Sequence, residues 1–208
     1  MWSWMVLACT MLLLMNACSS SRPLSTAQDK PIQVVQQAAG PVSPIQQLRT
    51  QAERGNVEAQ FALAQAYDRG RDVPKDKIEA VRWYRLAALQ GDAFAQNALG
   101  DNYWEGTGVP KNETEAARWW HLAATQGFAP AQHSLGKILS GGGQGVRSDK
   151  IQAYMWLALS AAQGDEEAGR QGGILSKLLK PAEMTNAKKL VKQWKPSRAN
   201  VMNNKLVQ

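Results

Sequence analysis

Residues 92–127 read DAFAQNALGDNYWEGTGVPKNETEAARWWHLAATQG, and this stretch decides the fold because it occurs three times. Residues 56–91 repeat it as NVEAQFALAQAYDRGRDVPKDKIEAVRWYRLAALQG, and residues 128–164 form a third copy that is longer by one residue, in the glycine run 141–143. The positions that set the register are Ala59, Ala95 and Ala131; Leu63, Leu99 and Leu135; and Trp83, Trp119 and Trp156. Such in-register self-similarity is the signature of a repeat architecture.

Each copy carries the pattern of two helices joined by a loop. In the second copy, Ala95, Leu99 and Tyr103 recur at four-residue spacing, which places them on one helical face. The loop 105–110 reads EGTGVP; its glycines permit left-handed backbone at a helix end, and its proline cannot continue the helix. The predicted N-caps of the second helices, each three residues before Glu or Gln, are Asp76, Asn112 and Asp149.

These residues carry a family resemblance. The pattern A-Q-x-x-L-G-x-x-Y, G-x-G-V-P, A-x-x-W-Y/W-x-x-A-A-x-x-G resembles Sel1-like repeats, which are relatives of the tetratricopeptide repeat. The second copy matches it at Ala95, Gln96, Leu99, Gly100, Tyr103, Gly106, Gly108, Val109, Ala116, Trp119, Trp120, Ala123, Ala124 and Gly127. The first copy departs with Ala64 and Asp72 in place of two glycines, and the third with Leu139 in place of the tyrosine. The resemblance implies an all-α solenoid of helix-turn-helix repeats.

The segments beside the repeats are expected to complete the solenoid. Residues 45–55 resemble the end of a repeat and predict an N-terminal half-repeat cap. Residues 165–194 lack the motif but continue the helical pattern, and their lysines suit a terminal cap with a polar outer face. Residues 195–208 are predicted to be a disordered tail.

The N-terminal residues 1–17 read MWSWMVLACTMLLLMNA, whose apolar run is too short to span a bilayer and is typical of a signal peptide. The sequence around Cys18 resembles the lipobox of bacterial lipoproteins, which implies cleavage before Cys18 and its acylation. A plain secretory signal or an N-terminal anchor with an unmodified Cys18 is the alternative. Residues 18–44, rich in Ser, Gln, Ala and Pro, are expected to be a flexible tether.

Charge argues against nucleic acid as a partner. The chain has a formal net charge of +7, but residues 45–164 contain thirteen basic and twelve acidic residues and are nearly neutral. Phosphate binding requires a concentrated basic surface, which the repeats do not provide. The excess lies in residues 165–208, with nine basic and four acidic residues. A solvated helix face and tail, or a contact with anionic lipid headgroups, would account for it.

The sequence gives little support to an enzyme. Only two histidines and two cysteines are present, and they do not have the spacing of a metal site or a catalytic motif. No metal and no cofactor is therefore expected. A cell-wall-directed enzyme or enzyme accessory, or a secreted effector or inhibitor of the same repeat type, remains an alternative to a non-enzymatic scaffold anchored to the bacterial cell envelope, with its domain facing the periplasm at the outer membrane.

A partner-binding surface is the favoured interpretation. The resemblance implies that the first helices of the repeats line the concave face, where positions not used for packing would contact a protein partner. The predicted contact residues are Phe61, Phe94, Asn97, Asp101, Trp104, His133 and Lys137. Exposed aromatic side chains are favoured at interaction hot spots. The alternative for the aromatic residues is packing between neighbouring first helices, and the sequence does not decide between the two.

Overall fold

The computed structural model describes residues 43–197, which form nine α-helices. They are α1 (Pro44–Glu53), α2 (Val57–Arg69), α3 (Lys77–Leu89), α4 (Ala93–Glu105), α5 (Glu113–Thr125), α6 (Ala129–Gly141), α7 (Lys150–Ala161), α8 (Glu166–Leu178) and α9 (Pro181–Gln193). The predicted signal peptide, Cys18, the tether up to residue 42 and the tail from residue 198 lie outside the described residues. Within residues 43–197, no helix has the length and apolar character needed to cross a bilayer.

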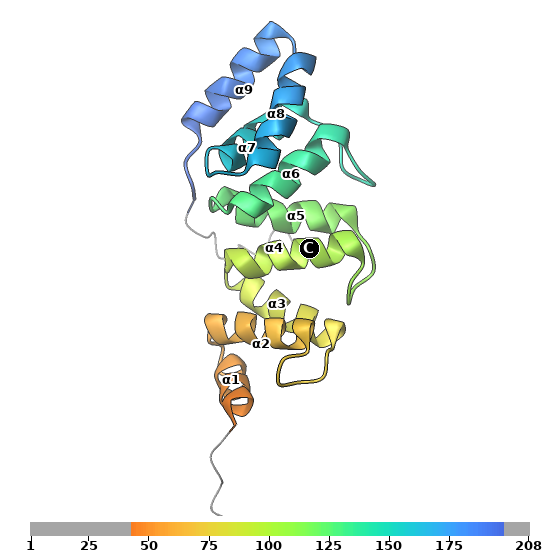
Figure 1. The fold of residues 1–208 in the computed structure, drawn as a ribbon, viewed down its shortest axis with the longest axis vertical. Coiled ribbons are helices and arrows are strands. Elements are labelled where there is room, and N and C mark those ends of the chain that lie inside the picture. The colour runs from red at the N-terminus through yellow and green to blue at the C-terminus, as the bar shows by residue number, and fades with distance from the viewer. Residues whose placement is uncertain (1–42, 198–208) are drawn as a thin grey trace, which may run out of the picture. The chain divides into compact units, whose positions relative to one another are not determined.

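The helices stack in chain order (Figure 1). From α1 to α8 each helix packs on the next one in sequence, and α9 returns to pack on α7. The pairs α2–α3, α4–α5 and α6–α7 are the three copies of the repeat. This arrangement confirms the prediction of an all-α solenoid built from helix pairs.

Side-chain caps determine where the second helices begin. Asp76, Asn112 and Asp149 accept hydrogen bonds from backbone N–H groups of the first turns of α3, α5 and α7, as the sequence predicts. The residue three positions later, Glu79, Glu115 or Gln152, does not return a bond to the backbone of the cap residue. In the first copy, Glu79 Oε1 instead accepts from Trp83 Nε1 at 2.9 Å, so this carboxylate fixes the orientation of a core tryptophan.

The core alternates large aromatic side chains with alanines. Trp83, Trp119 and Trp156 are at most 6% exposed, and the paired alanines at the ends of α3 and α5 are completely buried. The alanines let the next helix approach closely, while each tryptophan fills the space beside that contact. A buried aromatic side chain removes a large apolar area from water, so these residues are the main apolar support of the stack.

One departure between the copies has a direct steric reason. A Cβ atom on Gly100 would lie 2.5 Å from Cδ1 of Trp120, which packs over the backbone of α4 at this point. In the first copy, Ala64 and Tyr84 occupy the two corresponding positions, and both are buried. The indole of Trp120 therefore requires glycine at position 100, whereas Tyr84 leaves room for the methyl group of Ala64.

A second departure between the copies concerns a residue with left-handed backbone in the loop between the two helices. Gly108 has a left-handed backbone with φ of 71°, and a Cβ there would fall against the carbonyl oxygen of Lys77 at the start of α3. In the first copy Asp72 adopts the same left-handed region, with φ of 58°. The helix that corresponds to α3 for the first copy is α1, which begins at Pro44, so the described residues contain no counterpart of the Lys77 carbonyl.

A buried glutamine joins each copy to the helix before it. Gln96 of α4 is 2% exposed, and its Nε2 donates to the carbonyl of Ala88 in α3 at 3.0 Å. Its Oε1 accepts from Nε2 of Gln126, the C-cap of α5, at 2.7 Å. The same two bonds are made around Gln60, with Ala52 and Gln90, and around Gln132, with Ala124 and Gln163. The glutamine of the A-Q pair in the repeat motif thus fixes how consecutive helices pack.

We predict that Gln96→Met destabilises the protein by about 1–3 kcal/mol. The methionine keeps the volume but removes both hydrogen bonds of the buried side chain, at about 0.5–1.5 kcal/mol each. The Ala88 carbonyl still accepts from the Gly91 N–H, and the Gln126 amide still donates to the Gly91 carbonyl, so neither is left unpaired. Urea unfolding followed by circular dichroism measures the change. Gln51→Met, on the exposed face of α1, is the matched control and should stay within about 0.5 kcal/mol of the parent. Equal stability of the two variants would contradict the role assigned to Gln96.

Candidate functional site

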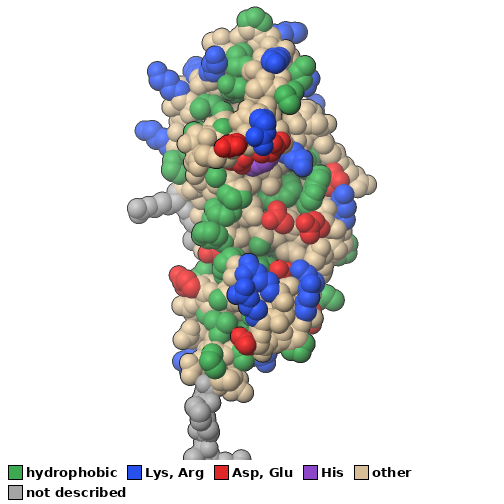
Figure 2. Space-filling model, viewed as in Figure 1, with side chains coloured by type: hydrophobic (Ala, Val, Ile, Leu, Met, Phe, Trp, Pro, Cys, Tyr) green, Lys and Arg blue, Asp and Glu red, His purple; other side chains and the backbone are tan. Residues whose placement is uncertain are grey.

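The seven predicted contact residues fall into separate places on the structure. Phe61 and Phe94 belong to a row of phenylalanine rings; Asn97, Asp101 and Trp104 lie together on α4; His133 sits at the joint between α6 and α8; and Lys137 is exposed on α6. Figure 2 shows hydrophobic side chains in small groups on the face in view, separated by acidic and basic ones. The predicted set is therefore three neighbourhoods and one isolated lysine.

The phenylalanine row consists of Phe61, Phe94 and Phe128. The ring centroids of Phe61 and Phe94 are 5.9 Å apart, and those of Phe94 and Phe128 are 4.8 Å apart with the rings edge to face. Phe61 also packs on Tyr84 at 5.7 Å and is half-buried, whereas Phe94 is 56% exposed. Phe61 thus combines core packing with a place in the row, and Phe94 presents its ring to solvent.

Sequence reasoning missed Phe128 as a member of this row. Phe128 aligns with the N-cap residues Asn56 and Asp92 of the other first helices, and it caps α6 without a side-chain hydrogen bond. The three phenylalanines occupy different positions in their repeats, so no single column of the alignment marks them. An aromatic residue at an N-cap position was the signal available in the sequence.

The second neighbourhood is a polar cluster on α4, next to an aromatic pair formed by Trp104 of α4 and Trp120 of α5. Asp101 Oδ1 accepts from Trp120 Nε1 at 2.9 Å, and Asp101 Oδ2 accepts from Asn97 Nδ2 at 2.9 Å. Trp104 packs on Trp120 with ring centroids 5.8 Å apart, and the Lys111 ammonium lies 4.9 Å from the Trp104 ring centroid. Trp104 is half-buried, so part of its surface serves the core and part remains accessible.

Burial has a measurable consequence for Asp101. Burial, aided by the charge of Glu105, raises the pKa of the Asp101 carboxyl to about 6, although hydrogen bonds from Trp120 and Asn97 oppose the shift. Asn97 Oδ1 is buried beside it and has no hydrogen-bond partner. When Asp101 is ionised, the cluster has three acceptor oxygens, two on Asp101 and one on Asn97, but only two donor groups, Trp120 Nε1 and Asn97 Nδ2. The Asn97 oxygen is the acceptor left without a donor.

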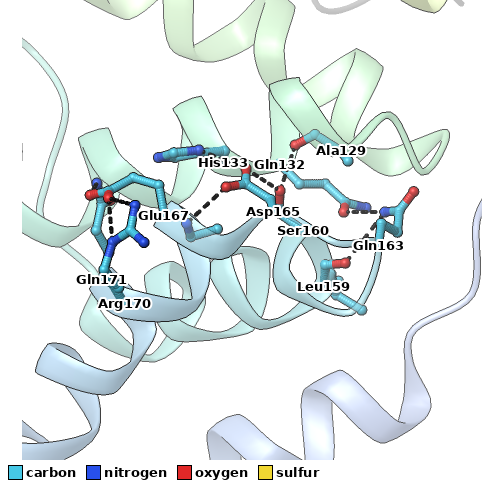
Figure 3. Close-up of polar contacts among 11 residues, drawn as sticks. Ala129, Gln132, His133, Leu159, Ser160, Gln163, Asp165, Glu167, Arg170 and Gln171 are labelled. Carbon is cyan, nitrogen blue, oxygen red and sulfur yellow. Dashed lines mark hydrogen bonds and ion pairs between the residues drawn. The ribbon is translucent and has the colours of Figure 1, made fainter.

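The third neighbourhood is the joint around Asp165, shown in Figure 3. Asp165 caps α8 by accepting from the Ala168 N–H at 2.9 Å, and its Oδ2 contacts His133 Nδ1 at 2.7 Å. Ser160 of α7 donates to the same Oδ2 at 2.9 Å and lies 2.9 Å from the Ala129 carbonyl oxygen. Although burial opposes it, hydrogen bonds from Ala168, Ser160 and His133 hold the pKa of Asp165 below its usual range. One carboxylate therefore ties α6, α7 and α8 together.

This joint brings Ser, His and Asp together without the geometry of a nucleophilic triad. In a triad the serine hydroxyl bonds to the histidine, and the aspartate bonds to the other ring nitrogen. Here Ser160 and His133 both contact one oxygen of Asp165, and Ser160 is completely buried. The arrangement is suited to holding the third repeat against the cap. Among residues 43–197, no three His, Cys, Asp or Glu side chains are grouped so that they could hold a metal ion.

Comparison with known proteins places the chain in a family. The Sel1 repeat matches residues 57–92, 93–128 and 129–165, which together are more than half of the chain. The chain belongs to the Sel1-repeat family. The resemblance inferred from the repeated motif is confirmed. Sel1-repeat proteins are generally protein-interaction scaffolds rather than enzymes.

Two solved structures show what the chain is similar to. A Sel1 repeat protein from Oxalobacter formigenes is 39% identical, with a TM-score of 0.57; the match covers 61% of this chain and 95% of that one. The protein c5321, a protective antigen of uropathogenic Escherichia coli with an SLR fold, is 29% identical, with a TM-score of 0.56. That match covers 74% of this chain but only 41% of c5321. No curated protein matches the chain.

We predict that Asp101→Asn stabilises this Sel1-repeat protein at neutral pH. Because the pKa of folded Asp101 lies above the ordinary value, ionisation costs folding free energy as the pH rises from about 4 through about 6. The shift corresponds to at most about 3 kcal/mol, and partial solvation of the carboxylate reduces it to about 1–2 kcal/mol. An amide at this position still accepts from Trp120 through its oxygen, and its NH2 group donates to the Asn97 oxygen once the Asn97 amide is turned by 180°.

Thermal unfolding of parent and variant from pH 3.5 to 8 measures this effect. The gain should be full at pH 7.5 and should vanish below about pH 4, where Asp101 is protonated in both the folded and unfolded chains. Asp68→Asn, at the ion pair with Lys77 on the first copy, is a control in which removing the carboxylate should bring no such gain at neutral pH. A stability difference that does not change with pH would contradict the assignment.

Proposed function

We propose that this protein is a non-enzymatic interaction scaffold that a lipid on Cys18 anchors to the bacterial cell envelope. Membership in the Sel1-repeat family supports the scaffold role. The lipobox-like sequence before Cys18 supports the anchor, and the Ser-, Gln- and Pro-rich residues up to 42 would let the helical domain reach a partner from the membrane surface. The domain would then face the periplasm, attached to the outer membrane.

The exposed ring of Phe94 carries the proposal for where the partner binds. Phe94 is 56% exposed between two other rings of the phenylalanine row, which hold it in place at little further entropy cost on binding. Large, pre-positioned aromatic side chains are typical of interface hot spots. Asn97 and Asp101 follow Phe94 on the same helix and would supply polar contacts at the edge of this surface.

We predict that Phe94→Ala abolishes capture of a protein partner while the domain stays folded. The experiment crosslinks the tethered protein in native membranes, recovers it and compares the crosslinked proteins by mass spectrometry. Ile78→Ala is the matched control, because Ile78 is 73% exposed on α3 and lies outside the phenylalanine row. A partner lost from both variants, or retained in Phe94→Ala, would exclude this surface. A large drop in melting temperature for Phe94→Ala would show that the ring is part of the core.

We predict that Cys18→Ser releases the protein from the membrane fraction. An acylated Cys18 contributes about 0.8 kcal/mol for each buried methylene, and more than one chain gives stable anchoring. Metabolic labelling with an alkyne fatty acid should mark the parent and leave Cys18→Ser unlabelled, while Cys9→Ser, inside the predicted signal peptide, should still be labelled. Unlabelled parent protein would rule out lipidation and favour a plain secretory signal.

A further inference from the structure

A groove of about 990 Å³ runs along the second helices of the repeats. Most of its lining comes from α5, and the rest comes from α3, α4, α6 and α7, from the loop between α6 and α7 and from Ser197. It includes none of the seven contact residues predicted from sequence. Leu122, Val146 and Trp156 contribute apolar surface, and Arg118, Arg147 and His121 contribute polar groups. The groove is therefore a surface distinct from the phenylalanine row.

The glycine loop of the third copy makes one wall of the groove. Residues 142–147 lie against the start of α5, where the Gln144 N–H donates to Glu113 Oε2 at 2.7 Å and Thr114 Oγ1 donates to the Gln144 carbonyl at 3.3 Å. Gly145 adopts φ of 79°, and a Cβ there would clash with Thr114. These contacts hold the loop in place and direct Val146 and Arg147 toward the lining of the groove.

The chain after α9 makes the other wall. The Ser197 N–H donates to the Thr125 carbonyl at 2.9 Å, and Trp194 packs edge-on against Trp156 with ring centroids 6.3 Å apart. Residues 195–197, expected in the disordered tail, are thus held against the end of α5. Both walls come from the parts of the chain that depart from the repeat motif.

The positive charge of the lining favours an acidic ligand. Arg85, Arg118 and Arg147 line the groove, against a single acid, Glu115. Arg118 donates to Glu115 at 2.6 Å, and Arg85 donates to the hydroxyl of Tyr103 at 2.6 Å. Arg147, on the glycine loop, has no partner among residues 43–197. The lining keeps a net positive charge that its own residues do not neutralise.

A buried donor with no acceptor lies in the same lining. Trp119 is 4% exposed, lines the groove, and its Nε1 has no hydrogen-bond partner. In the first copy, Glu79 accepts from both Arg82, at 3.1 Å, and Trp83 Nε1, at 2.9 Å. Glu115 occupies the corresponding place in the second copy but bonds Arg118 alone. An acidic group that binds Arg118 would free Glu115 to accept from Trp119.

We propose that this groove binds an extended segment of a partner protein in which acidic side chains alternate with apolar ones. The apolar lining takes the apolar side chains, and Arg118 and Arg147 take the acidic ones as charge-assisted hydrogen bonds. A lining drawn from all three copies fits a length of chain better than a compact molecule. This inference rests on the proposed scaffold function and adds a second surface with a stated chemistry.

The chain's own segments are less suited to the groove. Residues 198–208 read RANVMNNKLVQ and contain two basic residues and no acidic side chain, and the whole chain carries +7, so neither the C-terminal segment nor a second copy complements the arginines. The charge of the lining therefore favours a partner in trans.

Fluorescence anisotropy with the full chain, kept soluble in mild detergent, tests the proposal. The probes are a labelled ten-residue peptide of alternating Asp and Leu, and matched peptides of alternating Lys and Leu and of alternating Asp and Ser. The Asp–Leu peptide should bind at least tenfold more tightly than either of the others, and salt should weaken its binding. Arg147→Glu should weaken it at least tenfold, whereas Arg82→Glu, exposed on α3 outside the groove, should bind like the parent.

Several results would overturn the proposal. Equal affinity for the three peptides, or binding unchanged by Arg147→Glu, would show that the charge of the groove does not select the ligand. A large affinity gain for every peptide on deletion of residues 198–208 would assign the groove to the chain's own segment. A dimer dissociated by Arg147→Glu would assign it to a second copy, and complete displacement of the Asp–Leu peptide by phosphatidylglycerol vesicles would assign it to a lipid. Phe94→Ala should leave peptide binding unchanged. The test of the groove therefore does not depend on the test of partner binding at the phenylalanine row, and either proposal can fail without the other.

Discussion

The buried glutamine of each repeat is the contact on which the stack depends. Gln60, Gln96 and Gln132 each bond a carbonyl of the preceding helix and the amide side chain at the end of their own second helix. Apolar packing is tolerant of small shifts, but two directed bonds, one buried and one partly buried, restrict the separation and rotation between consecutive helices. The placement of the surface residues that these helices carry depends on that constraint.

The aromatic core explains which variations the repeats accept. Trp120 requires Gly100 beneath it and uses Asp101 as its acceptor, whereas the first copy pairs Tyr84 with Ala64. Replacing a tyrosine with a tryptophan thus brings a glycine and a partly buried carboxylate with it, and the carboxylate acquires a pKa of about 6. Differences between copies are coupled sets of changes rather than independent substitutions.

Features suited to binding arise where the repeat pattern breaks. The phenylalanine row uses a different position in each copy, and the groove owes its two walls to the lengthened loop of the third copy and to the chain after α9. Residues shared by all copies serve packing and capping. The proposed contacts with partners therefore lie on side chains that a description of the consensus repeat would leave out.

The sequence by itself determined the repeats, the helix pairs, the N-caps at Asp76, Asn112 and Asp149, and the family, because these depend on local periodicity and on residues near in the chain. It named Gln96 as part of the motif without indicating its role. Only the tertiary structure decided that Phe128 joins Phe94, that Asp101 binds Trp120 and that Arg147 reaches the groove of α5. These contacts join residues in different helices and copies, so their geometry depends on how the helices pack rather than on spacing along the chain.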